Sequence, residues 1–163
     1  KTIGIIGMGT IGHKVASVAE AFGMKVCYFS TSGTGHCKDY PCLPLEQLLA
    51  ESDIVSIHAP LNDRTLNLIG EKELNMMKPS AFLVNMGRGA IVVEADLAAA
   101  VDAGVIAGAG IDVFVTEPLP ENHPYLSMKH PERMRFAPHV AWSSMEARKR
   151  LIDIMAENIS ASI

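Results

Sequence analysis

Apolar residues in this chain form short continuous runs, and the segments between the runs have helical spacing. Continuous apolar runs are typical of parallel strands that are covered on both faces. The strand-like runs are residues 2–6, 25–29, 53–57, 81–84, 107–111 and 135–137. The helical segments between them are residues 10–22, 45–51, 71–77 and 94–103. This alternation predicts an α/β fold, a doubly wound parallel sheet with strand order 3-2-1-4-5-6 and helices on both faces.

The end of the chain predicts one further helix. Ser143 and Glu146 have the Ser-x-x-Glu spacing of a capping box, and an apolar stripe follows at helical spacing. Residues 30–44 and 112–134 contain much of the glycine and proline between the elements and predict two long loops. Loops of this length in a compact domain are usually functional or mobile. The apolar stripe of the last helix consists of Leu151, Ile154, Met155 and Ile159.

Composition places the chain among globular proteins that act on small molecules. It has 163 residues, of which 48% are hydrophobic, and a mean hydropathy of +0.20, which is enough apolar material for one domain. The formal net charge is -4, and lysines and arginines are scattered apart from a short cluster at 148–150. This distribution offers no basic patch to a nucleic acid or an anionic membrane. No apolar run reaches membrane-spanning length.

Cysteine usage and the N-terminus indicate the cellular setting. Cys27, Cys37 and Cys42 contain no Cys-x-x-Cys pair, which favours reduced thiols and a cytoplasmic location. His36, Cys37 and Cys42 invite a metal interpretation, but a closed structural zinc site takes about four ligands. We therefore expect no metal. The chain begins on Lys1 and enters a strand at once, without an apolar leader, which suggests a piece of a larger protein.

The segment IGIIGMGTIG has the Gly-x-Gly-x-x-Gly spacing of a dinucleotide-binding loop. It directly follows a predicted strand and opens a predicted helix, the context in which this pattern binds a pyrophosphate. Gly7 would make the tight turn, Gly9 would let the phosphates approach, and Gly12 would let the helix pack close to the sheet. Free amides at the helix N-terminus, including those of Thr10 and Ile11, would attract the phosphates. The segment predicts a dinucleotide cofactor.

The second part of the dinucleotide fingerprint is missing. An acidic residue normally follows the glycines by about 20 positions and binds the ribose hydroxyls. Ser30 occupies that position here, followed by Thr31 and Ser32. Loss of the carboxylate removes the repulsion that excludes a 2'-phosphate, and the hydroxyls, His36 and Lys38 could accept one, although this stretch contains no arginine. The sequence leaves NAD and NADP open as cofactors, with NAD as the first choice.

Each predicted strand ends at or near a residue that suits ligand binding. In an open parallel sheet, ligands bind beyond the carboxyl ends of the strands. With the expected strand order, the first three of these residues face the adenosine half of a cofactor, where His58 shapes the adenine side. The last three, together with Glu117, converge on the nicotinamide. In chain order, the strand-end residues are Gly7, Ser30, His58, Arg88, Asp112 and His139.

Two of these residues, Arg88 and His139, suit hydride transfer to or from a 2-hydroxy acid when they act together with Glu117. The unperturbed pKa of a histidine fits His139 as the base for a hydroxyl proton near neutral pH. Glu117 could hold the far ring nitrogen, and Arg88 offers a planar fork for a carboxylate or carbonyl. Taken singly, the histidine could be structural, the glutamate a solvated turn residue and the arginine a loop cap. Their joint position at the mouth of the predicted crevice favours catalysis.

Four stretches, in order and spacing, resemble the cofactor domain of the D-isomer-specific 2-hydroxyacid dehydrogenases: GIIGMGTIG, SIHAPLNDRTLNLIG, LVNMGRGAIVVEADLAAAVDAGVIAGAGIDVFVTEPLP and APHVAW. The resemblance implies an oxidoreductase that exchanges a hydride between NAD(P) and a D-2-hydroxy acid or 2-keto acid, with Arg88, Glu117 and His139 as catalytic residues. The expected cofactor contacts are Gly7, Gly9, Thr10, Ile11, Gly12, Ser30, Thr31, His58, Ala59, Pro60, Met86, Gly87, Arg88, Asp112, His139, Ala141 and Trp142.

The resemblance also sets expectations for the whole protein. The segment PHVAWSSMEARKRLID is most similar to the glycerate dehydrogenase, or hydroxypyruvate reductase, branch, which implies glycerate and hydroxypyruvate, or glyoxylate, as substrates. The family has a second, substrate-binding domain, so we expect residues 1–163 to be the dinucleotide-binding domain alone, with little or no turnover. A homodimer is expected. The alternative is a non-catalytic NAD(H)-sensing or corepressor module, which has less need of the His139–Glu117 pair.

Overall fold

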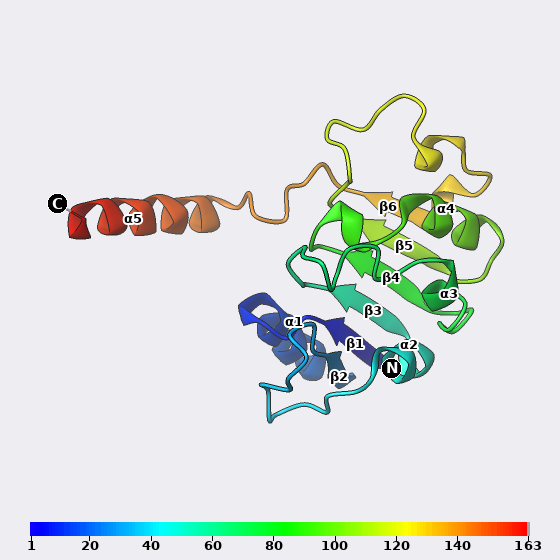
Figure 1. Ribbon diagram of the computed structural model, residues 1–163, viewed down its shortest axis with the longest axis horizontal. Coiled ribbons are helices and arrows are strands. Elements are labelled where there is room, and N and C mark those ends of the chain that lie inside the picture. Colours follow the sequence, from blue (N-terminus) through cyan, green and yellow to red (C-terminus); the bar gives the residue numbers. More distant parts are fainter. Residues whose placement is uncertain (163) are drawn as a thin grey trace.

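The computed structural model describes residues 1–162, whose six parallel strands form one sheet flanked by helices (Figure 1). The strands lie in the order β2-β1-β3-β4-β5-β6, and every neighbouring pair is parallel. The predicted parallel α/β fold is confirmed. The strand bounds are β1 Thr2–Ile6, β2 Lys25–Phe29, β3 Ile54–Ile57, β4 Phe82–Asn85, β5 Gly108–Ile111 and β6 Met134–Phe136.

Helices follow all strands except β5, and their ends differ from the predicted ones by a few residues. The largest difference is at α3, which stops at Leu74 where the side-chain amide of Asn75 donates to the carbonyl of Glu71 at 2.7 Å. Among residues 1–162, no helix combines the length and the apolar character that crossing a membrane requires. The helices are α1 Thr10–Ala21, α2 Leu45–Glu51, α3 Glu71–Leu74, α4 Glu94–Asp102 and α5 Met145–Ala161, with short 3-10 helices η1 Gly89–Ile91, η2 Pro124–Ser127 and η3 Pro131–Arg133.

The predicted strand order 3-2-1-4-5-6 is wrong in the place it gives the third strand. β3 lies between β1 and β4, not at the outer edge beyond β2. Residues 41–43 take the outer position as a single parallel bridge, in which Tyr28 donates to the carbonyl of Pro41 and Leu43 donates to that of Tyr28. Pro41 and Pro44 have no N–H to donate, so this segment does not extend into a full strand. The chain then crosses to the other side of β1.

Two apolar clusters form the core, one on each face of the sheet. On β1, Ile3 and Ile5 pack with Ala16 of α1, whereas Ile6 belongs to the larger cluster that contains Leu48 of α2. α2, α3 and α4 cover this second face, and α1 covers the first face over β1 and β2 (Figure 1). The predicted helices on both faces are therefore present.

α5 projects away from the sheet instead of folding back onto it (Figure 1). None of its described side chains is buried, and the predicted apolar stripe is exposed along it. The predicted cap is wrong by one residue: the hydroxyl of Ser144 accepts from the amide of Ala147 at 3.2 Å. The hydroxyl of Ser143 instead donates to the carbonyl of Val140 at 2.7 Å. A helix of this kind exposes an apolar stripe that it would normally bury.

Candidate active site

A crevice opens at the carboxyl end of β1. The neighbours of β1, β2 and β3, lie on its opposite sides, so the chain changes direction there, which is where open α/β sheets bind ligands. The crevice has a volume of about 260 Å³. Its lining includes most of the residues that the sequence assigned to the adenosine half of a cofactor, namely Gly7, Gly9, Ser30, Thr31, His58 and Pro60.

The glycine loop at this crevice has the geometry that a pyrophosphate needs. Gly7 has a φ of +94° and lies so close to the next loop that an added Cβ would be 2.8 Å from the Cα of Ala59. Gly12 lies directly against the carbonyl of Gly7. Around Gly9, in contrast, no heavy atom of the described residues comes within 4 Å of an added Cβ. This open space beside the N-terminus of α1 fits a bound phosphate.

His58 offers a second observation that fits a cofactor. Its Nε2 lies 2.9 Å from the hydroxyl of Ser56, while its Nδ1 is buried and has no hydrogen-bond partner within residues 1–162. Burial lowers the pKa of His58, so the ring is neutral near pH 7. A buried ring nitrogen normally finds a partner. A polar group of a ligand in the crevice could supply it.

The loop of residues 30–44, which we call the adenosine loop, is held by side-chain hydroxyls. The hydroxyls of Ser30 and Ser32 are 3.0 Å apart, and Nε2 of His36 lies 2.9 Å from the hydroxyls of both Ser32 and Thr34. Ser30, Thr31, Ser32 and His36 all line the crevice, and Lys38 is not among the lining residues. The expected hydroxyl-rich wall is present, but the expected lysine is not part of it.

An arginine reaches the adenosine loop from a distant segment. Nη1 of Arg64, in the loop after β3, donates to the carbonyl of Ser32 at 2.6 Å. Its guanidinium lines a cavity of about 350 Å³ beside Ser30 and Thr31. The sequence analysis found no arginine here because it searched only the residues that follow β2. β1 lies between β2 and β3, so the loop after β3 reaches that position across the end of β1.

The second group of predicted residues gathers beyond β4, β5 and β6, and we call Arg88, Asp112, Glu117 and His139 the nicotinamide rim. Asp112 is buried, and its two carboxylate oxygens accept from the amides of Val140 at 2.9 Å and Ala141 at 3.0 Å. These bonds hold the backbone just after His139, whose φ is +55°. A non-glycine residue in that conformation is strained and is often found at functional sites.

His139 and Glu117 form a hydrogen-bonded pair. Nδ1 of His139 lies 2.9 Å from Oε2 of Glu117, and Oε1 of Glu117 accepts from the amide of Phe114 at 3.0 Å. The hydrogen bond from Phe114, followed by that from His139, lowers the pKa of Glu117. An ionised carboxylate only accepts hydrogen bonds, so Nδ1 carries the ring proton. Nε2 is then the ring nitrogen that could exchange a proton with a ligand.

Arg88 lies on the same rim. Its positive charge makes a small contribution to the lowered pKa of Glu117. Asn85 fixes the loop that carries Arg88. Its side-chain Nδ2 donates to the carbonyl of Arg88 at 3.0 Å, and its side-chain Oδ1 accepts from the backbone amide of Gly87 at 3.0 Å. Next in the chain, Gly89 packs directly against the backbone of Phe114. The structure therefore brings the three predicted catalytic residues together.

The remaining predicted contacts are distributed around the same edge of the sheet. Ile11, Met86 and Trp142 are exposed, and Nε1 of Trp142 donates to the carbonyl of His139 at 2.9 Å. Ala59 is buried beneath the glycine loop and offers its backbone rather than its side chain. Thr10 is exposed at the first turn of α1. The predicted set therefore follows one continuous edge, from the glycine loop to α5.

Sequence reasoning missed two supporting residues. Oε1 of Glu94 accepts from the amide of Val115 at 3.0 Å, and Oε2 lies 2.9 Å from Nε2 of His123. His123 is buried. Together they hold the loop that carries Glu117. The only sequence signal was a glutamate at the start of a helix, which is common at helix N-termini for other reasons.

Comparison with known proteins agrees with this geometry. Residues 1–141 match the family model described as the NAD binding domain of the D-isomer specific 2-hydroxyacid dehydrogenases. The chain belongs to this family. The predicted family and fold are thereby confirmed, and the matched part of the family is its NAD binding domain.

Relatives of the chain include enzymes that act on small keto acids. It is 48% identical to a glyoxylate reductase from Aeropyrum pernix, an alignment that covers 99% of this chain and 48% of the relative, and 41% identical to a glycerate dehydrogenase from Methylorubrum extorquens, with 99% and 50% covered. A solved structure of an NADPH-dependent glyoxylate/hydroxypyruvate reductase from Sinorhizobium meliloti has a TM-score of 0.88 at 32% identity, over 99% of this chain and 50% of that one. The chain spans about half the length of these relatives.

Proposed function

We propose that the whole protein is a D-2-hydroxyacid dehydrogenase that reduces glyoxylate or hydroxypyruvate. The pairing of His139 with Glu117, with Arg88 on the same rim, is the observation that carries the proposal. Residues 1–163 would be its dinucleotide-binding domain. A second domain, outside this chain, would complete the substrate pocket. The family and the reductase names of the relatives support the choice of reaction.

The rim residues have complementary roles in this reaction. A nicotinamide cofactor, bound in the crevice, would supply or take up the hydride at the substrate carbon. Protonated His139 would give its Nε2 proton to the substrate oxygen during reduction and take it back during oxidation. Glu117 would stabilise the imidazolium, and Arg88 would orient the substrate carboxylate or carbonyl through its planar fork.

The His139→Gln variant of the whole protein tests this mechanism. We expect kcat for hydroxypyruvate or glyoxylate to fall by about 10²–10⁴-fold, the usual contribution of a general acid or base. The dissociation constant of the cofactor should stay within about twofold, because Gly9 and the adenosine loop are untouched. Unchanged turnover in the variant would refute the role of His139. An unmutated protein that binds the cofactor but turns over none of these substrates would instead support the sensing module.

We further propose that the cofactor is NADP(H) in preference to NAD(H). The carboxylate that would repel a 2'-phosphate is replaced by Ser30, and hydroxyl groups and Arg64 stand beside it. Arginine suits phosphate because its fork donates two parallel hydrogen bonds. Asp63 lines an outer cavity together with Arg64 and opposes this attraction in part.

Kinetics with both reduced cofactors test the preference. In the whole protein, Arg64→Gln should lower kcat/KM for NADPH by about tenfold and leave the value for NADH within about twofold. Asp63→Asn should raise the NADPH value. Lys38→Gln is the matched control, because it removes the same charge from a residue outside the two cavities. An unmutated protein that uses NADH a hundredfold better than NADPH would end this part of the proposal.

Assembly and location are proposals of the same kind. The exposed apolar stripe of α5 supports a homodimer in which this helix packs against other parts of the assembly. Light scattering of the whole protein with Leu151→Lys and Ile154→Lys tests the homodimer. If the helix makes no contact in the assembly, these substitutions will leave the measured mass unchanged.

The free thiols of Cys27, Cys37 and Cys42 support a cytoplasmic location. Fractionation of cells that express the protein tests the location.

A further inference from the structure

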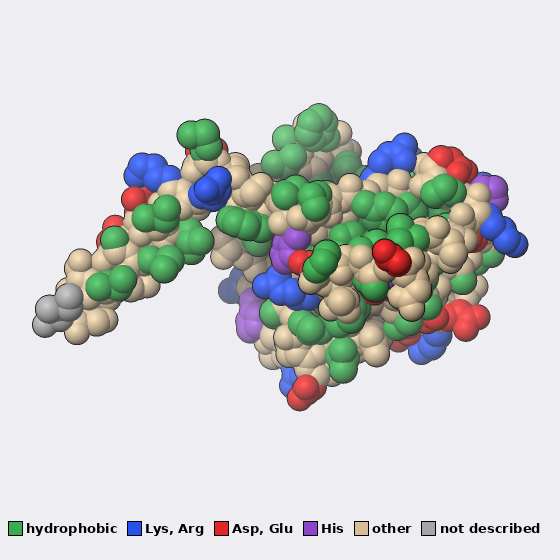
Figure 2. Space-filling view, turned by 90° about the horizontal axis from the view of Figure 1, so that it is seen from above, with side chains coloured by type: hydrophobic (Ala, Val, Ile, Leu, Met, Phe, Trp, Pro, Cys, Tyr) green, Lys and Arg blue, Asp and Glu red, His purple; other side chains and the backbone are tan. Residues whose placement is uncertain are grey.

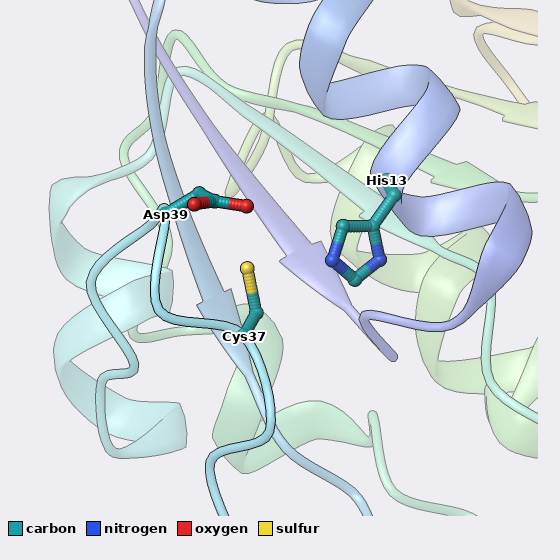
Figure 3. Close-up of side chains that lie close together, drawn as sticks. All are labelled: His13, Cys37 and Asp39. Carbon is teal, nitrogen blue, oxygen red and sulfur yellow. The ribbon is translucent and has the colours of Figure 1, made fainter.

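Three side chains with metal-binding atoms meet on the surface between α1 and the adenosine loop (Figure 3). His13 comes from the start of α1, and Cys37 and Asp39 come from the loop. A ring nitrogen of His13, Sγ of Cys37 and a carboxylate oxygen of Asp39 all lie within 4.8 Å of one another. All three side chains point into the same space. None of them belongs to the crevice lining described above.

The hydrogen bond of His13 prepares it as a ligand. Its Nδ1 lies 2.9 Å from the carbonyl of Gly9. A carbonyl only accepts, so Nδ1 carries the proton and the lone pair of the neutral ring is on Nε2. Histidine ligands of metals almost always donate their other ring N–H to a carbonyl or carboxylate in this way. The ring edge opposite this bond faces Cys37 and Asp39 (Figure 3).

The position of Cys37 is fixed by the core. The hydroxyl of Tyr28, a buried residue of β2, donates to the carbonyl of Cys37 at 3.1 Å and accepts from its amide at 3.2 Å. The set weighed from the sequence, His36 with Cys37 and Cys42, is not assembled. His36 is bound to serine and threonine hydroxyls within the loop, and Cys42 lines the cavity beside Arg64.

The three donor types select the class of metal. Thiolate and imidazole suit zinc and its spectroscopic substitute cobalt, whereas magnesium and calcium take oxygen ligands. Zinc bonds of about 2.0–2.3 Å bring ligand atoms closer together than they are here, by roughly 1 Å. Asp39 can supply that movement because it is exposed on the loop. Three protein ligands leave the fourth tetrahedral position to water.

We propose that His13, Cys37 and Asp39 bind Zn²⁺, and that the bound ion clamps the adenosine loop to α1. Cys37 binds as the thiolate and releases its proton to solvent on binding. The clamp joins the helix that begins at the phosphate loop to the loop that forms the ribose side of the crevice. Zinc occupancy would thereby order the cofactor-binding face before the cofactor arrives. The binding of zinc itself does not depend on the proposed reaction.

Cobalt provides a direct test in the whole protein after removal of metals with a chelator. We expect one Co²⁺ per chain, with the ligand-to-metal charge-transfer absorption of a cobalt–thiolate bond, and its displacement by Zn²⁺. Cys37→Ser should abolish that absorption. His13→Gln and Asp39→Asn should each weaken Co²⁺ binding by at least about tenfold. Circular dichroism of each variant separates lost binding from lost folding.

Cys42→Ser is the matched control, because it removes the other accessible thiol of the same loop. It should leave the cobalt spectrum unchanged. Loss of the absorption in this control, its persistence in Cys37→Ser, or the absence of any cobalt–thiolate band would overturn the site. Hydrogen exchange of residues 30–44 tests the clamp: Zn²⁺ should slow it at least about threefold in the unmutated protein and not in Cys37→Ser. Stoichiometric binding without slower exchange would overturn the clamp.

Discussion

The adenosine loop lines the crevice at the end of β1, the nicotinamide rim lies beyond β4, β5 and β6, and the two are held in different ways. On the rim, carboxylates accept hydrogen bonds from backbone amides: Asp112 from Val140 and Ala141 of a distant segment, and Glu117 from Phe114 of its own loop. In the adenosine loop, exposed serine and threonine hydroxyls bind one another and His36. The space-filling view shows histidine, acidic and basic side chains close together near the base of the projecting helix (Figure 2).

This difference suits the rim to the proposed reaction and the adenosine loop to the proposed choice of cofactor. Backbone amides have few alternative positions, so the rim keeps its geometry when no cofactor is bound, as preorganised catalytic groups must. Side-chain hydroxyls rotate and can be replaced one at a time without disturbing the sheet. The adenosine loop is therefore a place where the proposed cofactor preference and metal binding would be able to change without altering the proposed reaction.

After His139→Gln, the largest effect is expected from Glu117→Gln in the whole protein, which removes the carboxylate that holds His139. The amide cannot stabilise a protonated His139, so kcat should fall by about 10²–10³-fold with little change in cofactor binding. Steady-state kinetics with hydroxypyruvate and isothermal titration with the cofactor measure the two quantities. Glu121→Gln, on the same loop, is the matched control and should stay near the unmutated rate. Equal losses in both variants would show that the rim is not the centre of catalysis.

Ser30→Asp tests the adenosine loop by adding the carboxylate that this position lacks. A carboxylate at this position would repel a 2'-phosphate and bind ribose hydroxyls, so the ratio of kcat/KM for NADPH to that for NADH should fall by about a hundredfold. kcat with saturating NADH should change little, because the rim is untouched. A variant that loses both cofactors equally would mean that the loop collapses rather than discriminates.

Gly9→Ala should have a smaller effect that is confined to cofactor binding. The Cβ of the new alanine would enter the open space beside α1 without touching the described protein atoms, so the melting temperature should not change. Cofactor affinity should fall by about tenfold because the methyl group takes up room that the pyrophosphate needs. Calorimetry and cofactor titration measure the two. A large fall in melting temperature would show that Gly9 serves the turn rather than the ligand.

The two regions also differed in how far the sequence could predict them. Rim residues follow buried strands directly, so once the strands were recognised, the positions of Asp112 and His139 at one edge followed. The partners of the adenosine loop come from segments that are remote in sequence. Arg64 reaches it from the loop after β3, and His13 reaches Cys37 from α1. A single sequence does not record such meetings, because they depend on the paths that the loops take in three dimensions.

The strand order shows the same limit. The prediction took the third apolar run, residues 53–57, as the edge strand, but a short bridge at Cys42 between two prolines fills that place. A single bridged residue leaves no hydrophobic pattern to detect. The N-cap of α5 was misplaced for a similar reason, since Ser143 and Ser144 are adjacent and only the backbone geometry tells them apart.

The smallest expected effect is a pH-dependent loosening of the rim. The pKa of Glu117 is lowered in the fold from its usual value of 4.5, chiefly by the amide of Phe114 and then by His139. The stabilisation that this carboxylate gives is therefore fully present above pH 4.5 and is lost as the pH falls through the lower folded pKa. Trp142 reports the change, because its Nε1 donates to the carbonyl of His139.

Fluorine NMR of the whole protein labelled with fluorotryptophan measures this loosening. The Trp142 signal, identified by its absence in Trp142→Phe, should shift as the pH falls below 4.5. In Glu117→Gln the same signal should not titrate in this range, since the amide gains no proton. The adenosine loop has no such carboxylate at its hydroxyl cluster, so Ser30→Asp should leave the Trp142 titration as it is. Identical titrations in the unmutated protein and in Glu117→Gln would show that the pair does not hold the rim together.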